Sequence, residues 1–396
     1  MKKLLVIGAG FLQDFVIRKA VSMGYETLAV DADSNAIGFK SANKYAAINI
    51  VDEKACLRYA KQEKIDGVLT AATDYGVLTA AFVAREMGLP GLKYETAQLI
   101  KNKYKVRKWL FENKVDDSEQ AFEVNADTDI QAIARHLSYP VMVKPCDGSG
   151  SRGASRVDDA AGLREACEYA MNGSITHRAE VETFITGQEY GAESLVINGE
   201  VHVLAIMRKW MTKPPYYAEL GHAIPSGLPA EMEQKAKQYV EKAIKSLGIN
   251  HGAVNMDLLI TQDNKIHIVD IGARMGGNLI GSHIIPYGTG IDYMGALIQC
   301  SVGDPVDMKA GKHKAVASRL LAFEEGTIHT MPDTEKIEKE YDVEIHHHME
   351  AGMHVNEYHT NLDGCGYVIS QSDDLQDAIK KVDKVRTLIE RTCLEI

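Results

Sequence analysis

The sequence predicts a chain of mixed α/β and α+β class, with an N-terminal doubly wound parallel sheet, a strand-rich central region and a small β-rich C-terminal region. Residues 1 to about 95 alternate short apolar strands with helical patterns, which is typical of parallel sheets. The middle of the chain carries strands in hairpins with few helices, and the C-terminal region ends in an amphipathic helix. With 396 residues, of which 45% are hydrophobic and 25% charged, the chain can bury two or three cores.

The N-terminal sheet is expected to consist of strand and helix units. The strands are predicted at residues 3–10, 26–33 and 66–72, and the helices at 14–24, 53–64 and 77–91. Ligands of such sheets bind at the carboxyl ends of the strands. The residues expected to line that edge are Gly8, Gly10, Asp31, Thr73 and Asp74.

The first strand runs into the turn Gly8-Ala9-Gly10, and Asp31 follows the next strand. In a nicotinamide dinucleotide site, such glycines admit a pyrophosphate and the acid binds a ribose. Gln13, however, stands where the third glycine of that motif belongs. A nicotinamide-dependent oxidoreductase that uses Gly8, Gly10 and Asp31 is therefore one alternative prediction.

The central region is predicted to be an α+β unit. A helix within about 96–115 leads into it, and a helix at about 231–247 interrupts its strands, which are expected at 139–145, 178–185, 190–199, 200–208, 252–260 and 265–274. The C-terminal region carries strand patterns at 315–323, 344–353 and 364–372 before the helix over 373–396. We expect that helix to close a small β-rich domain.

Composition and charge narrow the classes of function. A net charge of −11 argues against a nucleic-acid-binding surface. No stretch approaches the roughly 20 apolar residues of a membrane span, so the protein is expected to be soluble and cytoplasmic. The six cysteines are scattered without a CxxC pair, which favours reduced thiols over disulfides.

The stretch YPVMVKPCDGSGSRGASRV, residues 139–157, predicts a loop that covers phosphates. A strand ends in a lysine before a loop of glycines and small polar residues. Glycines let successive N–H groups form an anion nest, and the lysine and an arginine add positive charge. An ordinary Gly/Ser surface loop is the alternative. The residues concerned are Lys144, Gly148, Ser149, Gly150, Arg152 and Gly153.

Two acids are predicted to face each other across the hairpin VNMDLLITQDNKIHIVDIGAR, residues 254–274. A two-residue turn at Asp263-Asn264 would place Asp257 opposite Asp270. A four-residue loop would give the same face, whereas an odd loop would not. Opposed residues have Cβ atoms roughly 4.5–5.5 Å apart, so like charges repel there unless a cation intervenes. Mg²⁺ suits such a pair, and two solvated hairpin acids are the alternative.

Together with EVETFITGQEYGAES, residues 180–194, these motifs resemble the ATP-grasp superfamily. In that family a strand lysine, a glycine-rich cover and a Glu-x-x-hydrophobic-x-Gly-x-Glu hinge hold ATP between two subdomains. NKYKVRKWL, residues 102–110, matches the segment that carries an earlier phosphate-binding lysine. The resemblance implies that Lys103, Lys144 and the cover contact the phosphates, that Glu182, Phe184 and Ile185 contact adenine, and that Glu189 contacts the ribose.

The resemblance also implies a metal ion, Mg²⁺ or Mn²⁺, at Asp257 and Asp270. The family pattern at the second acid is Glu-x-Asn-x-Arg, where this chain reads Asp270-Ile-Gly272-Ala-Arg274. A glycine in this position resembles the amino-acid-ligase side of the superfamily. The arginine there would hold a substrate carboxylate or an acyl-phosphate, whereas a plain surface salt bridge of Arg274 is the alternative.

The resemblance covers nearly the whole chain and implies three domains. Residues 1–97 resemble the pre-ATP-grasp domain of carbamoyl-phosphate synthetase, biotin carboxylase and phosphoribosylglycinamide synthetase, whose first turn is similarly Gly-x-Gly-x-x-Gln. Residues 98–305 would form the ATP-grasp domain, with a lid at about 137–205. Residues 306–396 would form a C-terminal cap.

The expected function is that of an ATP-dependent carboxylate–amine ligase that acts through an acyl-phosphate and uses small-molecule substrates. Lys144, Arg152 and Arg274 are the expected catalytic residues. Thr73, Asp74, His222 and Arg274 are candidate substrate contacts, with His222 expected in a loop, where a structural histidine is the alternative. A nucleotide-binding regulator without turnover is a further alternative, suggested by Gly272.

Two further features concern a possible metal-binding run and the assembly of the chain. The run His346 to His348 lies in a strand-like stretch, so its neighbours point to opposite faces and cannot all bind one metal ion. A homodimer is one assembly that the sequence allows.

Overall fold

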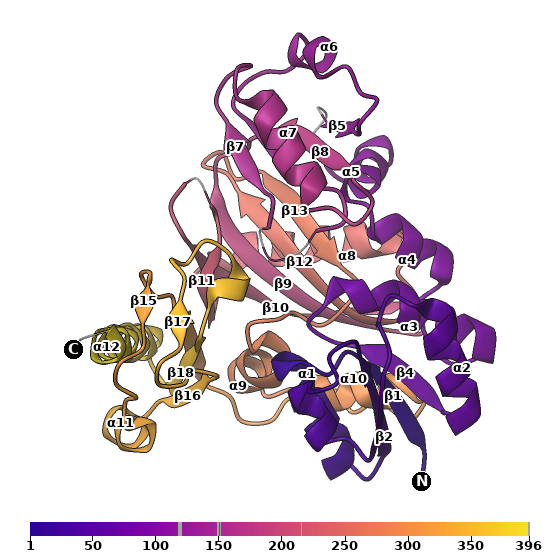
Figure 1. Ribbon diagram of the computed structural model, residues 1–396, viewed down its shortest axis with the longest axis vertical. Coiled ribbons are helices and arrows are strands. Elements are labelled where there is room, and N and C mark those ends of the chain that lie inside the picture. The colour runs from indigo at the N-terminus through magenta and orange to yellow at the C-terminus, as the bar shows by residue number, and fades with distance from the viewer. Residues whose placement is uncertain (118–120, 149, 151, 215, 395–396) are drawn as a thin grey trace.

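The computed structural model describes residues 1–117, 121–148, 150, 152–214 and 216–394. Its strands form a parallel sheet at the N-terminus, two further sheets in the centre and C-terminal region, and one short strand pair (Figure 1). This is the predicted combination of α/β and α+β structure.

The N-terminal sheet is parallel, as predicted, and has the strand order β3-β2-β1-β4. After Lys3 its first strand is apolar, and Leu4 to Ile7 are completely buried between helices. The elements are β1 (Lys3–Ile7), α1 (Phe11–Ser22), β2 (Glu26–Asp31), η1 (Ile37–Lys40), β3 (Lys44–Ala47), α2 (Glu53–Glu63), β4 (Gly67–Thr70), η2 (Asp74–Gly76) and α3 (Val77–Met87).

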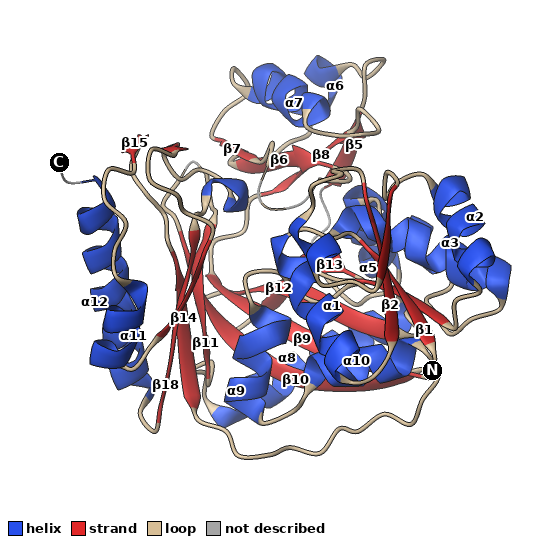
Figure 2. Ribbon diagram, turned by 60° about the horizontal axis from the view of Figure 1, so that its bottom comes forward, coloured by secondary structure: helices blue, strands red, loops and turns tan. Residues whose placement is uncertain are grey.

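A four-stranded antiparallel sheet follows two helices that leave the N-terminal part, and Figure 2 shows helices on its outer side. Its order is β5-β8-β6-β7, so the strand that ends near Lys144 lies beside the strand that carries Glu182. The elements are α4 (Tyr94–Ile100), α5 (Lys103–Glu112), β5 (Ala121–Val124), α6 (Ile130–Ala134), β6 (Val141–Pro145), β7 (Ser155–Val157), α7 (Leu163–Asn172) and β8 (Ala179–Thr183).

An eight-stranded sheet joins the centre of the chain to its C-terminal region, in the order β13-β12-β9-β10-β11-β14-β18-β16. β11 and β14 make the junction through the pairs Ala223–Ala317 and Ile224–Val316. The strands are β9 (Gln188–Ile197), β10 (Glu200–Met211), β11 (Glu219–Ile224), β12 (Gly252–Ile260), β13 (Ile266–Gly272), β14 (Ala315–Leu320), β16 (Glu344–His347) and β18 (Gly366–Ser372).

Helices cover this sheet because their apolar residues recur on one face. In α8 (Ala230–Ser246) the buried residues are Ala236, Val240, Ala243 and Ile244, which pack with the central strands. In α12 (Leu375–Leu394) the buried residues pack on β14 and β18 (Figure 2). The remaining elements are η3 (Ile280–Ile284), α9 (Ile285–Thr289), α10 (Tyr293–Ser301), β15 (Gly326–Thr327), α11 (Thr334–Tyr341), β17 (His354–Val355) and η4 (Asn361–Asp363).

Candidate active site

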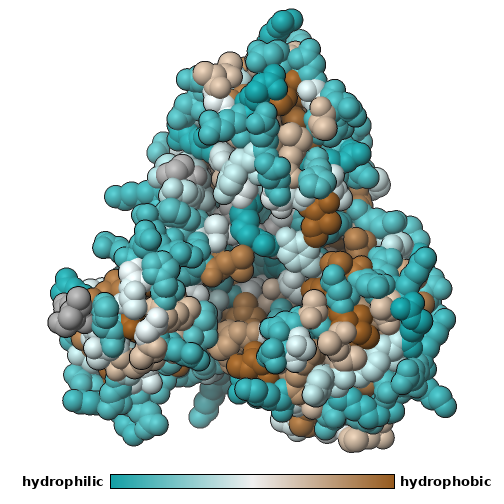
Figure 3. All heavy atoms as spheres, viewed as in Figure 1, coloured by the Kyte–Doolittle hydropathy of each residue, from teal (hydrophilic) through white to brown (hydrophobic). Residues whose placement is uncertain are grey.

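A cavity of about 770 Å³ opens where the N-terminal, central and C-terminal parts of the chain meet. Figure 3 shows a hollow at the centre of this face. Asp74 lines it from the N-terminal part, and Asn361 and Tyr367 line it from the C-terminal part, while strands of both central sheets form its walls. Its size lies in the range of roughly 300–1,000 Å³ that is usual for small-molecule sites.

The two acids of the predicted hairpin face each other in this cavity. Asp257 on β12 is directly paired with Asp270 on β13, which confirms the predicted pairing. The predicted two-residue turn is wrong, because Ile260 pairs with Ile266 and the loop between them is odd in length. A β-bulge compensates for the odd loop length. Val269 is an extra residue on β13, and it returns Asp270 to the face of the sheet on which Asp257 lies.

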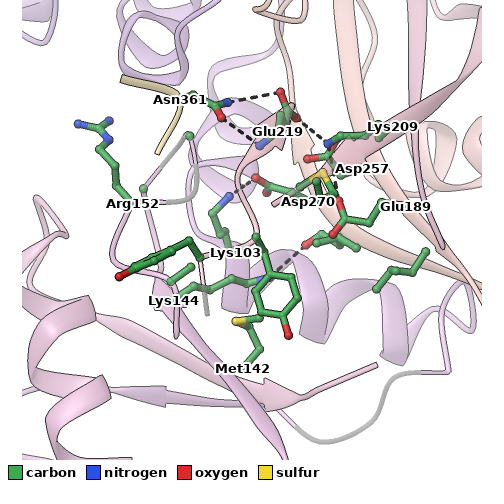
Figure 4. A pocket seen from close by; sticks show the side chains of 18 of the residues that line it. Lys103, Met142, Lys144, Arg152, Glu189, Lys209, Glu219, Asp257, Asp270 and Asn361 are labelled. Atoms are coloured by element: carbon green, nitrogen blue, oxygen red, sulfur yellow. Dashed lines mark hydrogen bonds and ion pairs between the residues drawn. The ribbon is translucent and has the colours of Figure 1, made fainter. Parts of the chain in front are cut away.

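Each acid has a lysine beside it (Figure 4). Lys209 donates from Nζ to Asp257 Oδ1 at 2.8 Å, and Lys103 contacts Asp270. Burial opposes ionisation of Asp270, but the charges of Lys103 and Lys144 outweigh it and lower its pKa to about 2. The lysines therefore offset the repulsion that the sequence predicts between the two acids.

Lys144 is held at the cavity wall by acids from β8. Its Nζ lies 2.6 Å from Glu182 Oε1 and 3.8 Å from Glu180 Oε2. Arg107 of α5 donates to the other oxygen of Glu182 at 2.8 and 2.9 Å. Burial opposes ionisation of Glu182, but Arg107 and Lys144 outweigh it and lower its pKa, whereas burial raises the pKa of Glu180 to about 7.

The backbone of the bulge is also part of this arrangement. Lys144 Nζ donates to the carbonyl oxygen of Val269 at 3.1 Å. Lys144 thus connects the four-stranded sheet to the hairpin that carries both acids. A cation held this way is positioned before any ligand binds.

Lys209 on β10 is a functional candidate that sequence reasoning missed. Its side chain is only 1% exposed, and its Nζ lies 2.6 Å from Glu219, 2.8 Å from Asp257 and 3.8 Å from Glu189. Gly191, the partner of Asp257 on β9, lies beside the stem of Lys209, and a Cβ there would be in ordinary contact with Lys209 Cδ at 3.7 Å. The predicted strand ended at Arg208, one residue before Lys209, whereas β10 continues to Met211.

Arg274 forms a two-point ion pair with Asp74, which brings the edge of the N-terminal sheet to the hairpin. Nε donates to Oδ1 at 3.1 Å and Nη2 donates to Oδ2 at 2.8 Å. Nη1 donates to Asn255 Oδ1 at 3.2 Å, and the Asn255 amide donates to the fully buried Glu193 at 2.9 Å. The side chain of Arg274 is 15% exposed and lines the cavity, so its salt bridge with Asp74 lies inside the cavity and not on the outer surface.

The glycine-rich loop after β6 borders the cavity through Gly148, Gly150 and Arg152. Gly150 and Gly153 have φ angles of +67° and +71°, which favour glycine. Ser149 lies outside the described residues. Phe184, Ile185 and Glu189 also line the cavity.

Two candidate substrate residues lie in other settings. His222 belongs to strand β11 and is 1% exposed, so its predicted place in a loop is wrong. The short apolar run around it is hydrogen-bonded to β10 and β14, which the neighbouring glycine and proline concealed in the sequence. Thr73 caps η2, where its hydroxyl accepts from the N–H of Tyr75 at 3.4 Å.

The first Gly-x-Gly turn is filled by the chain itself. Asp31 accepts from the N–H of Ala9 at 2.9 Å, and Gln13 donates to the carbonyl of Ala71 at 2.6 Å. A Cβ at Gly8 would lie 3.3 Å from the Gln13 side chain. These contacts disfavour a nicotinamide dinucleotide in this turn.

None of the helices in the described part of the chain has the length and apolar character that a membrane span requires. All six cysteines lie in that part and are free and buried.

Comparison with known proteins identifies two domain families in the chain. The profile of the ATP-grasp domain matches residues 137–282, and that of the L-amino acid ligase C-terminal domain 2 matches residues 319–392. The crystal structure of an L-amino acid ligase from Bacillus licheniformis is similar to the whole chain, with a TM-score of 0.84, 23% identity and coverage of 98% of this chain and 97% of that one. The fold is therefore that of the ATP-grasp ligases.

Two relatives match part of the chain. An uncharacterized protein of Sinorhizobium fredii is 26% identical over 276 residues, which are 68% of this chain and 56% of the relative. A D-alanine–D-alanine ligase of Cupriavidus pinatubonensis is 27% identical over 198 residues, which are 48% of this chain and 59% of the relative. The matches thus span less than two thirds of the length of these relatives.

Proposed function

We propose, from the premise that the chain carries an ATP-grasp domain and an L-amino acid ligase C-terminal domain, that the protein is an ATP-dependent carboxylate–amine ligase. ATP-grasp enzymes use ATP and Mg²⁺. The observation that carries the proposal is the pairing of Asp257 with Asp270 in a cavity where Lys103, Lys144 and Arg274 also meet.

The residues present fit a nucleotide with a divalent cation. Asp257 and Asp270 offer two carboxylates on one face, and Mg²⁺ takes one or two carboxylates with phosphate oxygens and water. When bound, the ion would neutralise phosphate charge and orient the transferred group. Both acids now face lysines, so each has a cationic neighbour before the metal ion binds.

The nucleotide contacts follow from the walls of the cavity. Lys103 and Lys144 would hold the phosphates, together with Gly148, Gly150 and the glycine loop. Glu182 with the backbone of Phe184 and Ile185 would bind adenine, and Glu189 would bind the ribose. Because Glu182 already accepts from Arg107 and Lys144, its carboxylate is fixed in place for such a contact.

The reaction would proceed in two steps. A carboxylate oxygen attacks the γ-phosphorus, the bond to the β-phosphate oxygen breaks, and ADP leaves. The amine nitrogen then attacks the carbonyl carbon of the acyl-phosphate, the carbon–oxygen bond breaks, phosphate leaves, and nitrogen loses a proton. Arg274 would hold the carboxylate and stabilise the oxyanion of the second step, since Asp74 and Asn255 fix its guanidinium.

A substrate screen tests the proposal. L-amino acids and small carboxylates, alone and in pairs, are incubated with Mg-ATP, and formation of ADP and phosphate is measured. We expect at least one pair to release both products, and an ¹⁸O-labelled carboxylate to transfer one labelled oxygen to phosphate. Release of ADP without this transfer would contradict the acyl-phosphate, and nucleotide binding without any turnover would favour a regulator.

A matched pair of variants controls the screen. Asp257→Asn removes one acid of the proposed metal site, whereas Asp263→Asn changes an exposed acid in the loop of the same hairpin. We expect turnover to fall sharply in Asp257→Asn and to stay at the wild-type level in Asp263→Asn. Equal turnover in both variants would contradict the assignment of the paired acids.

A further inference from the structure

A second group of metal-ligating side chains lies outside the cavity, where η3 meets the edge of the C-terminal sheet. His283 of η3 and Glu344 and His346 of β16 place one ligand atom each within 4.8 Å of one another. In Figure 1, α9, which continues η3, lies between β16 and α1. The group therefore joins parts of the chain that are far apart in sequence.

Strand geometry selects two of these ligands. Residues two apart in a strand point to the same face, so Glu344 and His346 project together, while His347 projects to the opposite face. His348 makes an aromatic contact with Phe11 at 6.0 Å. The expectation that the three consecutive histidines cannot share one metal ion therefore agrees with this arrangement, and the second imidazole comes from His283.

The spacing suits a tetrahedral ion. With metal–ligand bonds of about 2.1 Å, ligand atoms in a tetrahedral site lie about 3.4 Å apart. His346 Nε2 and Glu344 Oε2 are 3.6 Å apart, and all three ligand atoms lie within 4.8 Å. Side-chain rotations that move the ligand atoms by about an ångström would therefore bring all three to coordination distance. His346 Nε2 is buried and has no hydrogen-bond partner among the residues that the structure describes.

Neighbouring hydroxyl groups orient the ligands. His283 Nδ1 lies 2.7 Å from Ser282 Oγ, which in turn donates to the carbonyl of Leu279 at 3.4 Å. With Nδ1–H as the donor to the serine oxygen, the lone pair of His283 would lie on Nε2. Tyr287 donates its hydroxyl to Glu344 Oε2 at 2.9 Å. Such outer contacts are typical of metal-ligating histidines and carboxylates.

The surroundings exclude bulk water from one side. The Phe15 ring contacts His283 edge-on at 5.2 Å and His346 at 5.7 Å. An apolar ring therefore lies beside both imidazoles on this side of the group.

We propose that His283, Glu344 and His346 form a binding site for a divalent transition metal ion of the zinc type. Two imidazole nitrogens and a carboxylate oxygen are ligands that Zn²⁺ accepts, whereas Mg²⁺ prefers oxygen alone. The ion would link the central part of the chain to β16. Water would supply the fourth ligand, because the side chains of Glu344 and His346 are 42% and 25% exposed.

Metal binding to the untagged full-length protein tests the proposal. After treatment with a chelator, the protein is titrated with Co²⁺ and then Zn²⁺ in excess Mg²⁺, and visible absorption and metal content are measured. We expect one Co²⁺ per chain with tetrahedral absorption bands, displacement by Zn²⁺, and a higher Tm with Zn²⁺. Absence of binding at micromolar affinity would overturn the proposal.

Variants locate the ion. Glu344→Gln and His346→Asn should each weaken Zn²⁺ binding at least about 100-fold, and Ser282→Ala should weaken it about tenfold. His347→Asn, on the opposite face of the same strand, should bind as the wild type does. Unchanged binding in both ligand variants, or equal loss in His347→Asn, would overturn the assignment. If a ligand variant does not fold, the wild-type and His347→Asn titrations still decide.

Discussion

A single methyl group at Gly272 is expected to disrupt the arginine of the candidate active site. A Cβ at this position would lie 2.8 Å from Asp74 Oδ1 and 3.0 Å from Arg274 Cζ, inside the 3.4 Å at which ordinary contacts begin. In Gly272→Ala the ion pair between Asp74 and Arg274 must therefore shift or lose one of its two hydrogen bonds. A charge-assisted hydrogen bond contributes roughly 1.5–3 kcal/mol, which corresponds to a fall of about 10- to 150-fold in kcat/KM.

The assay compares kcat/KM for the carboxylate found in the substrate screen, with ATP affinity by calorimetry and Tm as further measurements. Gly162→Ala is the matched control, because its Cβ would make only an ordinary 3.6 Å contact with Val157. We expect ATP affinity to change little in either variant, and the losses in Gly272→Ala and Asp74→Asn to be less than additive in the double variant. Wild-type kcat/KM in Gly272→Ala, or full additivity in the double variant, would refute the reasoning.

Three further predictions concern charges in the cavity. Lys144→Met should raise the Kd of ATP, measured by calorimetry, at least about tenfold, since a charge-assisted phosphate contact contributes roughly 1.5–3 kcal/mol. The control variant Lys108→Met changes an exposed lysine and should leave this Kd unchanged. Equal ATP affinities of the two variants would contradict the role of Lys144. Asp270→Asn should raise the Mg²⁺ concentration for half-maximal turnover and lower the free energy of unfolding at pH 7 by roughly 1–2 kcal/mol. The pKa of the Asp270 carboxyl is lowered to about 2, so its stabilising contribution is present above about pH 4 and lost as the pH falls toward 2. A Tm equal to that of the wild type at pH 7 would count against this contribution. Burial raises the pKa of Glu189 to about 7, so its contribution to stability is present below about pH 4.5 and lost as the pH rises through 7. Between about pH 5 and 8 the Tm of Glu189→Gln should therefore fall less than the Tm of the wild type. Parallel Tm profiles would exclude this contribution of Glu189.

The fold was largely predictable because alternating polarity and chain order are local signals. The strand and helix units of the first part of the chain, the hairpin of Asp257 and Asp270 and the C-terminal amphipathic helix all have such patterns. The short strands β5 and β7 were missed, since three or four residues carry too little periodicity. His222 was misplaced because pairing with strands on both sides, rather than local propensity, determines its conformation.

The residues of the candidate site could be predicted only where they belong to a recognisable sequence motif. The paired acids follow from hairpin spacing, Lys144 from the strand end before the glycine loop, and Arg274 from the resemblance to ATP-grasp proteins; the structure brings them into one cavity. Lys209 was missed because its partners come from separate strands, β9, β11 and β12, which nothing in the local sequence relates. The cluster of His283 with β16 was missed for the same reason.

The bulge at Val269 bears on how this hairpin can vary between homologous proteins. The extra residue lies between the solvent-exposed loop and the acids. The loop over residues 261–265 can therefore gain or lose residues, provided that β13 keeps its register with β12. Deletion of the single residue Val269 would instead rotate Asp270 to the far side of the sheet and withdraw the carbonyl that Lys144 contacts. Insertions and deletions should therefore be common in the loop over residues 261–265 and rare at Val269, four residues after the loop.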